Sequence, residues 1–267
     1  MTSFRGINLR SGDLAEQLGL LLLKNLALVS PVPRTEDVGI DAVATLIRKY
    51  DSRRYFAEDN FFIQIKSESI SSITFKDQEV KWLYALELPY FVATVDRSCS
   101  KIDLFCGHRL SDALVTNHNR QVIEIFFDED KTSDELVDKD DNEVHIGPPV
   151  MSWSLKELEN DSDLPSKFYE IIKSHIILYK SSLRARDVGW IEYVAWKTNE
   201  PARSVGFKSV ISRSPQESLD NAYDEMMPYF FTWQQELIRT KNWSAADDVV
   251  SLLEKTKDLI ERLKSEI

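Results

Sequence analysis

The chain has 267 residues, of which 43% are hydrophobic and 10% aromatic, so it can bury one large core or two small ones. No apolar run approaches the roughly 18–20 residues that span a bilayer, so no membrane-spanning segment is expected. The first residues lack the apolar stretch of a secretory signal, which predicts a cytoplasmic protein with Cys99 and Cys106 as reduced thiols. The net charge of −11 opposes nucleic-acid binding unless basic residues are clustered.

The first predicted element is a helix over about residues 12–28, where leucines form a broad apolar face and Pro31 and Pro33 end the pattern. Glu16 lies within this helix. Asp13 and Glu16 also have the spacing of a capping box at a helix start, so Glu16 has a structural explanation beside any chemical one.

Two short runs rich in Val, Ile and Phe follow, and both predict strands, over residues 38–47 and 61–67. Alternate side chains of a strand share a face, so Gln64 and Lys66 point the same way. If the two strands pair as a hairpin, Asp41 can lie beside Gln64 and Lys66.

The middle of the chain predicts a mixed sheet. The connection over residues 48–60 is charged and without an apolar period, which indicates a solvated loop. Beyond it, the pattern favours a helix over residues 76–88 and strands over residues 69–75, 90–95, 102–106 and 121–127. This order of elements predicts an α/β fold with a mixed β-sheet flanked by helices. The four histidines show no zinc-ligand spacing to cysteine, and we expect them at the surface or as satisfied polar groups.

An acidic block over residues 127–143 interrupts this pattern, and Gly147 followed by two prolines marks a boundary after it. The block is interpreted either as a solvated linker or as a gate that repels nucleic acid until it is displaced. These features predict two domains, over residues 1–145 and 150–267.

The second domain is predicted to be α-rich and to end in a helical hairpin, with helices over residues 164–183, 215–239 and 243–267 and strands over 188–197 and 204–211. The aromatic residues of the second helix pack in a core or offer a surface for base stacking. The last helix has apolar or small residues at alternating spacings of three and four, which is typical of a coiled-coil seam. That seam either closes within one chain or joins a second subunit as a homodimer.

Glu16, Asp41, Gln64 and Lys66 together suit a site for a hard cation. Mg²⁺ prefers oxygen ligands, which the Asp41 carboxylate, the Gln64 side-chain carbonyl and the Ile65 backbone carbonyl offer. Glu16 restores the negative charge that an amide lacks, and Lys66 orients the attacking water or stabilises developing charge. Each residue also has an ordinary explanation, with Asp41 in a turn and Gln64 and Lys66 on the wet face of a half-buried strand.

The ordered set of a helix Glu, D-x-G-x-D ending at Asp41, and Q-x-K-S over residues 64–67 resembles the PD-(D/E)XK nuclease superfamily. The resemblance is to its Mrr-like variant, in which glutamine replaces the second acid, and it covers roughly residues 10–127. It implies a restriction-endonuclease-like fold, with Glu16, Asp41, Gln64 and Lys66 as catalytic residues. It further implies Mg²⁺ or Mn²⁺ bound by the first three and by Ile65. The long 48–60 connection departs from the family pattern.

The resemblance implies a metal-dependent endonuclease that hydrolyses the phosphodiester bonds of DNA. It also implies a prokaryotic setting in defence against invading DNA, with a protein of the same defence system as a partner. The alternative function is a catalytically idle nuclease-fold module that binds a nucleic acid or a protein. An amide in place of an acid weakens the ligand set, and the acidic net charge weakens attraction to DNA.

Overall fold

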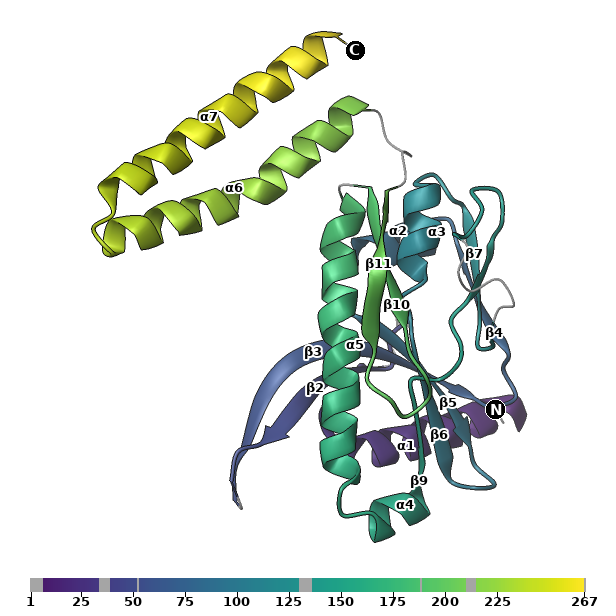
Figure 1. Cartoon of the computed structure of the whole chain (residues 1–267). Coiled ribbons are helices and arrows are strands. Elements are labelled where there is room, and N and C mark those ends of the chain that lie inside the picture. Colours follow the sequence, from purple (N-terminus) through teal and green to yellow (C-terminus); the bar gives the residue numbers. More distant parts are fainter. Residues whose placement is uncertain are drawn as a thin grey trace.

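The computed structural model describes residues 7–33, 39–51, 53–129, 136–187, 189–209 and 215–266. Its centre is a six-stranded sheet (Figure 1) with the spatial order β1 (Ala27–Pro31), β2 (Ala42–Lys49), β3 (Tyr55–Ser67), β5 (Tyr90–Asp96), β6 (Lys101–Cys106) and β9 (Met151–Ser154). Strands β3 and β5 are parallel, and the other neighbouring pairs are antiparallel. Helices flank the sheet and form the carboxy-terminal part, which confirms the predicted α/β fold class.

The first helix, α1 (Ile7–Lys24), starts and ends earlier than predicted. A turn at Asn25 stops it, and the Asn25 side-chain amide donates to the Leu21 carbonyl at 2.8 Å. The next residues form β1, at the edge of the sheet, instead of continuing the helix. Pro31 ends this edge strand, where a missing N–H group is tolerated.

Strands β2 and β3 form the predicted hairpin, with Ala42 opposite Ile63. The prediction of a solvated loop over residues 48–60 is wrong, because the pairing continues to Lys49 opposite Tyr55. This outer part of the hairpin reaches beyond the helices that cover the sheet (Figure 1). Its side chains therefore carry no apolar alternation, although its backbone keeps the ladder hydrogen bonds.

One face of the six-stranded sheet is a continuous apolar layer covered by α1 and α5 (Leu164–Asp187). Gly19 of α1 approaches β3 so closely that a Cβ atom there would lie 2.9 Å from the Ile65 side chain. On α5, the Phe168 ring meets the Trp153 ring edge-on at a centroid distance of 5.5 Å. Both helices thus close over the same buried layer.

The opposite face is covered by α2 (Gln78–Ala85) and by a second sheet of β4 (Ser72–Lys76), β7 (Val122–Phe126) and β8 (Glu143–His145). The Tyr90 ring of β5 contacts Phe75 of β4 and Trp82 of α2 at centroid distances of 6.4 Å. Strand β5 is therefore buried on both faces, which explains its almost unbroken apolar sequence.

The boundary at residues 145–150 stays a prediction, but the chain on both sides of it contributes to one core. Strand β9 belongs to the central sheet, and α5 packs on that sheet. The short helices α3 (Leu110–Thr116) and α4 (Leu155–Asn160) and the hairpin of β10 (Trp190–Ala195) and β11 (Arg203–Ser209) complete this body.

The last two helices, α6 (Pro215–Arg239) and α7 (Trp243–Glu266), pair with each other and extend away from the body (Figure 1). The predicted seam of α7 is the side with the least exposure, since Ala246 and Ile260 are buried while Leu259 is 48% exposed. On α6, Phe230 is buried, whereas Trp233 is 56% exposed. The seam therefore closes against α6 of the same chain.

Candidate metal sites

Asp41 lies immediately before β2, at the point where β2 and β3 part. Its backbone N–H donates to the Ile63 carbonyl at 2.9 Å, which extends the ladder by one bond. Its side-chain Oδ2 accepts from the backbone N–H of Ile65 at 2.5 Å. The carboxylate thus accepts from a backbone N–H of β3 that lies beyond Ala42, the first residue of β2.

Gln64 and Lys66 share one face of β3, as the alternation predicts. The register of β2 with β3 ends at Ala42 opposite Ile63, and Asp41 is joined to β3 by its hydrogen bonds to the backbones of Ile63 and Ile65. Gln64 is 6% exposed, and its Oε1 accepts a hydrogen bond from the Tyr90 hydroxyl at 2.5 Å. Lys66 is half-buried.

The Ile65 carbonyl points to the same edge of β3 as the Asp41 carboxylate. In a strand, the N–H and C=O groups of one residue face the same neighbour, and the direction repeats every second residue. The carbonyl of Ile63 accepts from Asp41, and the N–H of Ile65 donates to Asp41. The Ile65 carbonyl is therefore turned toward the space in which Asp41 lies.

Glu16 is a half-buried residue inside α1, not at its start. Because α1 begins at Ile7, the alternative explanation of Asp13 and Glu16 as a capping box is wrong. Residues three apart share a helix face, so Glu16 lies one turn before Gly19, on the side of α1 that packs on β3 and β5. Gly19 approaches the Ile65 side chain, so α1 packs on the face of β3 opposite to Gln64 and Lys66, and whether Glu16 reaches the same ion as Asp41 stays a prediction.

Several basic side chains of the outer β2–β3 hairpin and α5 bind to groups within the chain. Arg48 pairs with Glu58 at 2.9 Å, and Lys180 pairs with Asp59 at 2.6 Å. Arg186 is buried and donates to backbone carbonyls at the end of α2. The positive charge around the outer β2–β3 hairpin and α5 is thus partly neutralised within the chain.

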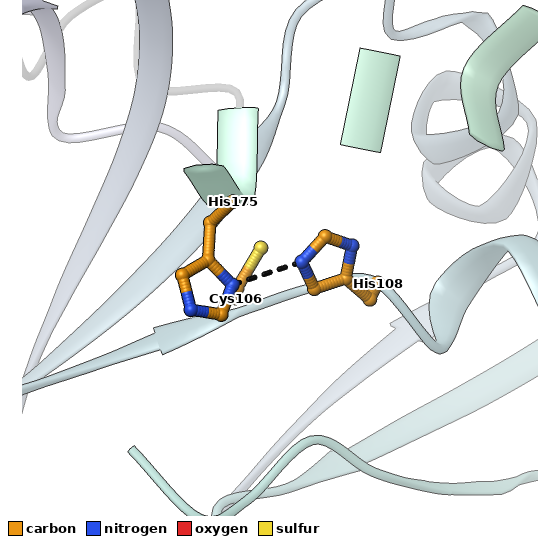
Figure 2. Close-up of side chains that lie close together, drawn as sticks. All are labelled: Cys106, His108 and His175. Carbon is orange, nitrogen blue, oxygen red and sulfur yellow. Dashed lines mark hydrogen bonds between the residues drawn. The ribbon is translucent and has the colours of Figure 1, made fainter. Parts of the chain in front are cut away.

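A second group of possible metal ligands lies two strands away from β3, where Cys106 ends β6, His108 follows it, and His175 comes from α5 (Figure 2). All three are buried, and their donor atoms lie within 4.8 Å of one another. His108 Nε2 and His175 Nδ1 are 3.0 Å apart and hydrogen-bonded. This group could hold a metal ion, although its sulfur and nitrogen donors do not suit Mg²⁺.

Burial sets the protonation of these three side chains. It lowers the pKa of His175 to about 3 and, with His175 nearby, holds the pKa of His108 well below its usual value. Burial also raises the pKa of the Cys106 thiol, against a backbone hydrogen bond from His108. At neutral pH, both imidazoles are therefore neutral and keep a lone pair.

The expectation of surface or satisfied histidines is wrong for His108 and His175. His108 Nδ1 and His175 Nε2 are buried without a hydrogen-bond partner among the described residues. The two histidines are 67 residues apart in the chain, so their spacing gave no signal. The one local signal was Cys106-Gly107-His108 at the end of a strand. Both cysteines are free thiols, as predicted.

His108 also lines a cavity of about 520 Å³ beneath the β10–β11 hairpin. Charged side chains on its wall include Arg109, Asp112 and Lys208. Burial raises the pKa of Asp112 to about 7, with Arg109 and Lys208 opposing the shift.

No protein-family model, curated protein or solved structure matches the chain. Within the described residues, the helices are too short or too polar to cross a membrane. The chemistry of the chain is therefore inferred from its own side chains.

Proposed function

We propose that the chain is a metal-dependent nuclease that hydrolyses phosphodiester bonds of DNA with Mg²⁺ or Mn²⁺ bound at Asp41. The observation that carries this proposal is the 2.5 Å hydrogen bond from the Ile65 N–H to Asp41 Oδ2. It ties a carboxylate to the strand that bears Gln64 and Lys66, where the two strands diverge.

The oxygen donors near this point are of the type that Mg²⁺ selects. Asp41 supplies a carboxylate, and the Ile65 carbonyl faces the same edge of β3. Gln64 supplies an amide oxygen from the neighbouring position of β3, and Glu16 of α1, which packs on the opposite face of the sheet, adds the second negative charge of the proposed ligand set. A bound divalent ion lowers the pKa of its water and polarises the phosphoryl oxygen.

In this proposal, Lys66 acts on the reacting groups. It shares a face with Gln64, so its ammonium group can approach the phosphate that the ion would bind. There it orients the attacking water and stabilises negative charge on the phosphorus oxygens. The water oxygen becomes bonded to phosphorus, the bond to the leaving sugar oxygen breaks, and that oxygen takes up a proton.

Two observations favour an idle nuclease-fold module as the second candidate. The Gln64 carbonyl already accepts the Tyr90 hydroxyl, so it must share or leave this bond to bind an ion. The net charge of −11 also disfavours DNA, because neutralising phosphates supplies much of the affinity for nucleic acid. Such a module would bind nucleic acid or a protein without cutting. A prokaryotic defence role belongs to the proposal through the family resemblance alone.

The test is cleavage of plasmid DNA, and of RNA in parallel, with Mg²⁺ or Mn²⁺. We expect the wild-type chain to cut DNA, a chelator to stop it, and Asp41→Asn to lose activity. Asp248→Asn, an exposed acid on α7, is the matched control and should cut normally. Equal cleavage by Asp41→Asn would refute the site. Intact DNA and RNA together with a gel shift would support the idle module.

A further inference from the structure

The buried Cys106–His108–His175 group has the composition of a transition-metal site. Thiolate and imidazole are the ligands that zinc uses most, at about 2.3 Å and about 2.0–2.1 Å. Two imidazole nitrogens on one tetrahedral ion lie about 3.4 Å apart, whereas His108 Nε2 and His175 Nδ1 are 3.0 Å apart. If the distance between these two nitrogens increased by about 0.4 Å, one ion could bind both of them.

The three donors already point at one another before any ion is bound. Figure 2 shows the Cys106 sulfur beside the two facing nitrogens of His108 and His175. Their elements are held in place independently, because β6 is inside the sheet and α5 is packed on it. The group is thus preorganised, which reduces the cost of collecting three ligands around an ion.

The hydrogen bond between the two imidazoles does not account fully for their burial. Two neutral rings hold two N–H groups and two lone pairs, and their mutual bond uses one of each. One N–H and one lone pair remain buried, and neither outer nitrogen has a partner among the described residues. If the two rings served only to pack the core, apolar side chains would avoid the free-energy cost of these unpaired polar groups.

We propose that Cys106 Sγ, His108 Nε2 and His175 Nδ1 bind one Zn²⁺ ion per chain. The fourth position is taken by water or hydroxide, because no carboxylate of the described residues joins the three donors. A thiolate and a hydroxide neutralise the two charges of the ion, as burial in an apolar setting requires.

His108 also lines the cavity beneath the β10–β11 hairpin, which therefore lies beside this ligand of the proposed site. Neutral imidazoles accept the ion without losing a proton, whereas the thiol of Cys106 releases its proton on binding. Zinc affinity is therefore expected to increase with pH. This site shares no ligand with the proposed nuclease site, whose ligands are the oxygen atoms of Glu16, Asp41, Gln64 and Ile65.

The test is metal analysis of the full-length chain after stripping and dialysis against Zn²⁺. We expect one bound Zn²⁺ per chain and a higher melting temperature than that of the stripped chain, since only the folded state holds the assembled site. Co²⁺ in place of Zn²⁺ should give the near-ultraviolet charge-transfer absorption of a thiolate–cobalt bond and the intense visible bands of a four-coordinate ion.

Three variants test whether the metal binds at Cys106 and not at the other cysteine or at Asp41. Cys106→Ser should weaken zinc binding by at least about a hundredfold and remove the charge-transfer absorption, because it removes a direct ligand. Cys99→Ser, at the exposed cysteine, and Asp41→Asn should each keep both signals. Substoichiometric zinc in the wild type, or a cobalt spectrum without thiolate absorption, overturns the proposal even if Cys106→Ser fails to fold.

Discussion

Among single residues, substitution of Lys66 tests most directly whether the Gln64–Lys66 face of β3 is catalytic. If Lys66 stabilises charge on the phosphate, Lys66→Ala should reduce DNA cleavage by roughly a hundredfold to a thousandfold, equivalent to ~2.7–4 kcal/mol of barrier, while the fold is kept. Lys66→Arg should not restore activity, because a guanidinium presents its charge in a different geometry.

The control is Lys76→Ala, at an exposed lysine on β4. Initial rates on plasmid DNA, with circular dichroism to verify folding, provide the measurement. If Lys66→Ala cuts as fast as Lys76→Ala, Lys66 is a solvent-facing strand residue and has no part in the chemistry.

Asp112 predicts a specific dependence of stability on pH. Burial raises its pKa from 3.8 to about 7, so the native carboxyl keeps a proton that the unfolded chain has lost. The free energy of unfolding should therefore decrease as pH increases from about 4 to about 7, and level off above that. Asp112→Asn keeps the shape without the charge, and should be more stable than wild type at about pH 8 by on the order of 2–4 kcal/mol.

Urea unfolding at several pH values measures this effect. Asp248→Asn should follow the wild-type curve, because that side chain is exposed. Parallel pH curves for wild type and Asp112→Asn would mean that the buried carboxyl titrates normally.

At the scale of elements, the α6–α7 pair offers two adjacent aliphatic residues with opposite surroundings. Ile260 is 8% exposed and faces α6, while Leu259 is 48% exposed. Ile260→Ala should destabilise the pair by ~2–4 kcal/mol through the lost apolar contact and the cavity, and Leu259→Ala by well under half as much. Hydrogen exchange of the α6 and α7 amides measures the difference locally. Similar exchange rates in both variants would show that α7 does not rest on α6 through this seam.

At the scale of the whole molecule, the α6–α7 pair and the body should be separable. The buried core cluster ends with Leu183 of α5 and contains no residue of α6 or α7. Removing residues 215–267 should therefore leave the body folded, with nearly the same melting temperature. Removing only residues 243–267 exposes the inner face of α6, including Phe230, and should cause aggregation or a new oligomeric state.

Light scattering and thermal melting of the two truncated chains provide the measurement. A soluble chain without α7, with unchanged mass per particle and unchanged melting temperature, would contradict a role of the seam in packing.

The sequence by itself determined the elements that rest on local periodicity. The strands around Asp41 and Gln64 paired as expected, because alternating apolar residues fix which face of each strand is buried. The three-four spacing of α7 likewise fixed the side that meets α6. The shared face of Gln64 and Lys66 follows from the same two-residue period, so this part of the candidate site was predictable.

The tertiary structure alone decided the contacts between distant segments. Strand β9 pairs with β6, β4 pairs with β7, and His175 meets Cys106 and His108 only because α5 crosses the sheet at that point. Local periodicity records which face of an element is apolar, not which element covers it. The outer β2–β3 hairpin was missed for a related reason, since strands that project beyond the core keep their backbone hydrogen bonds without burying side chains.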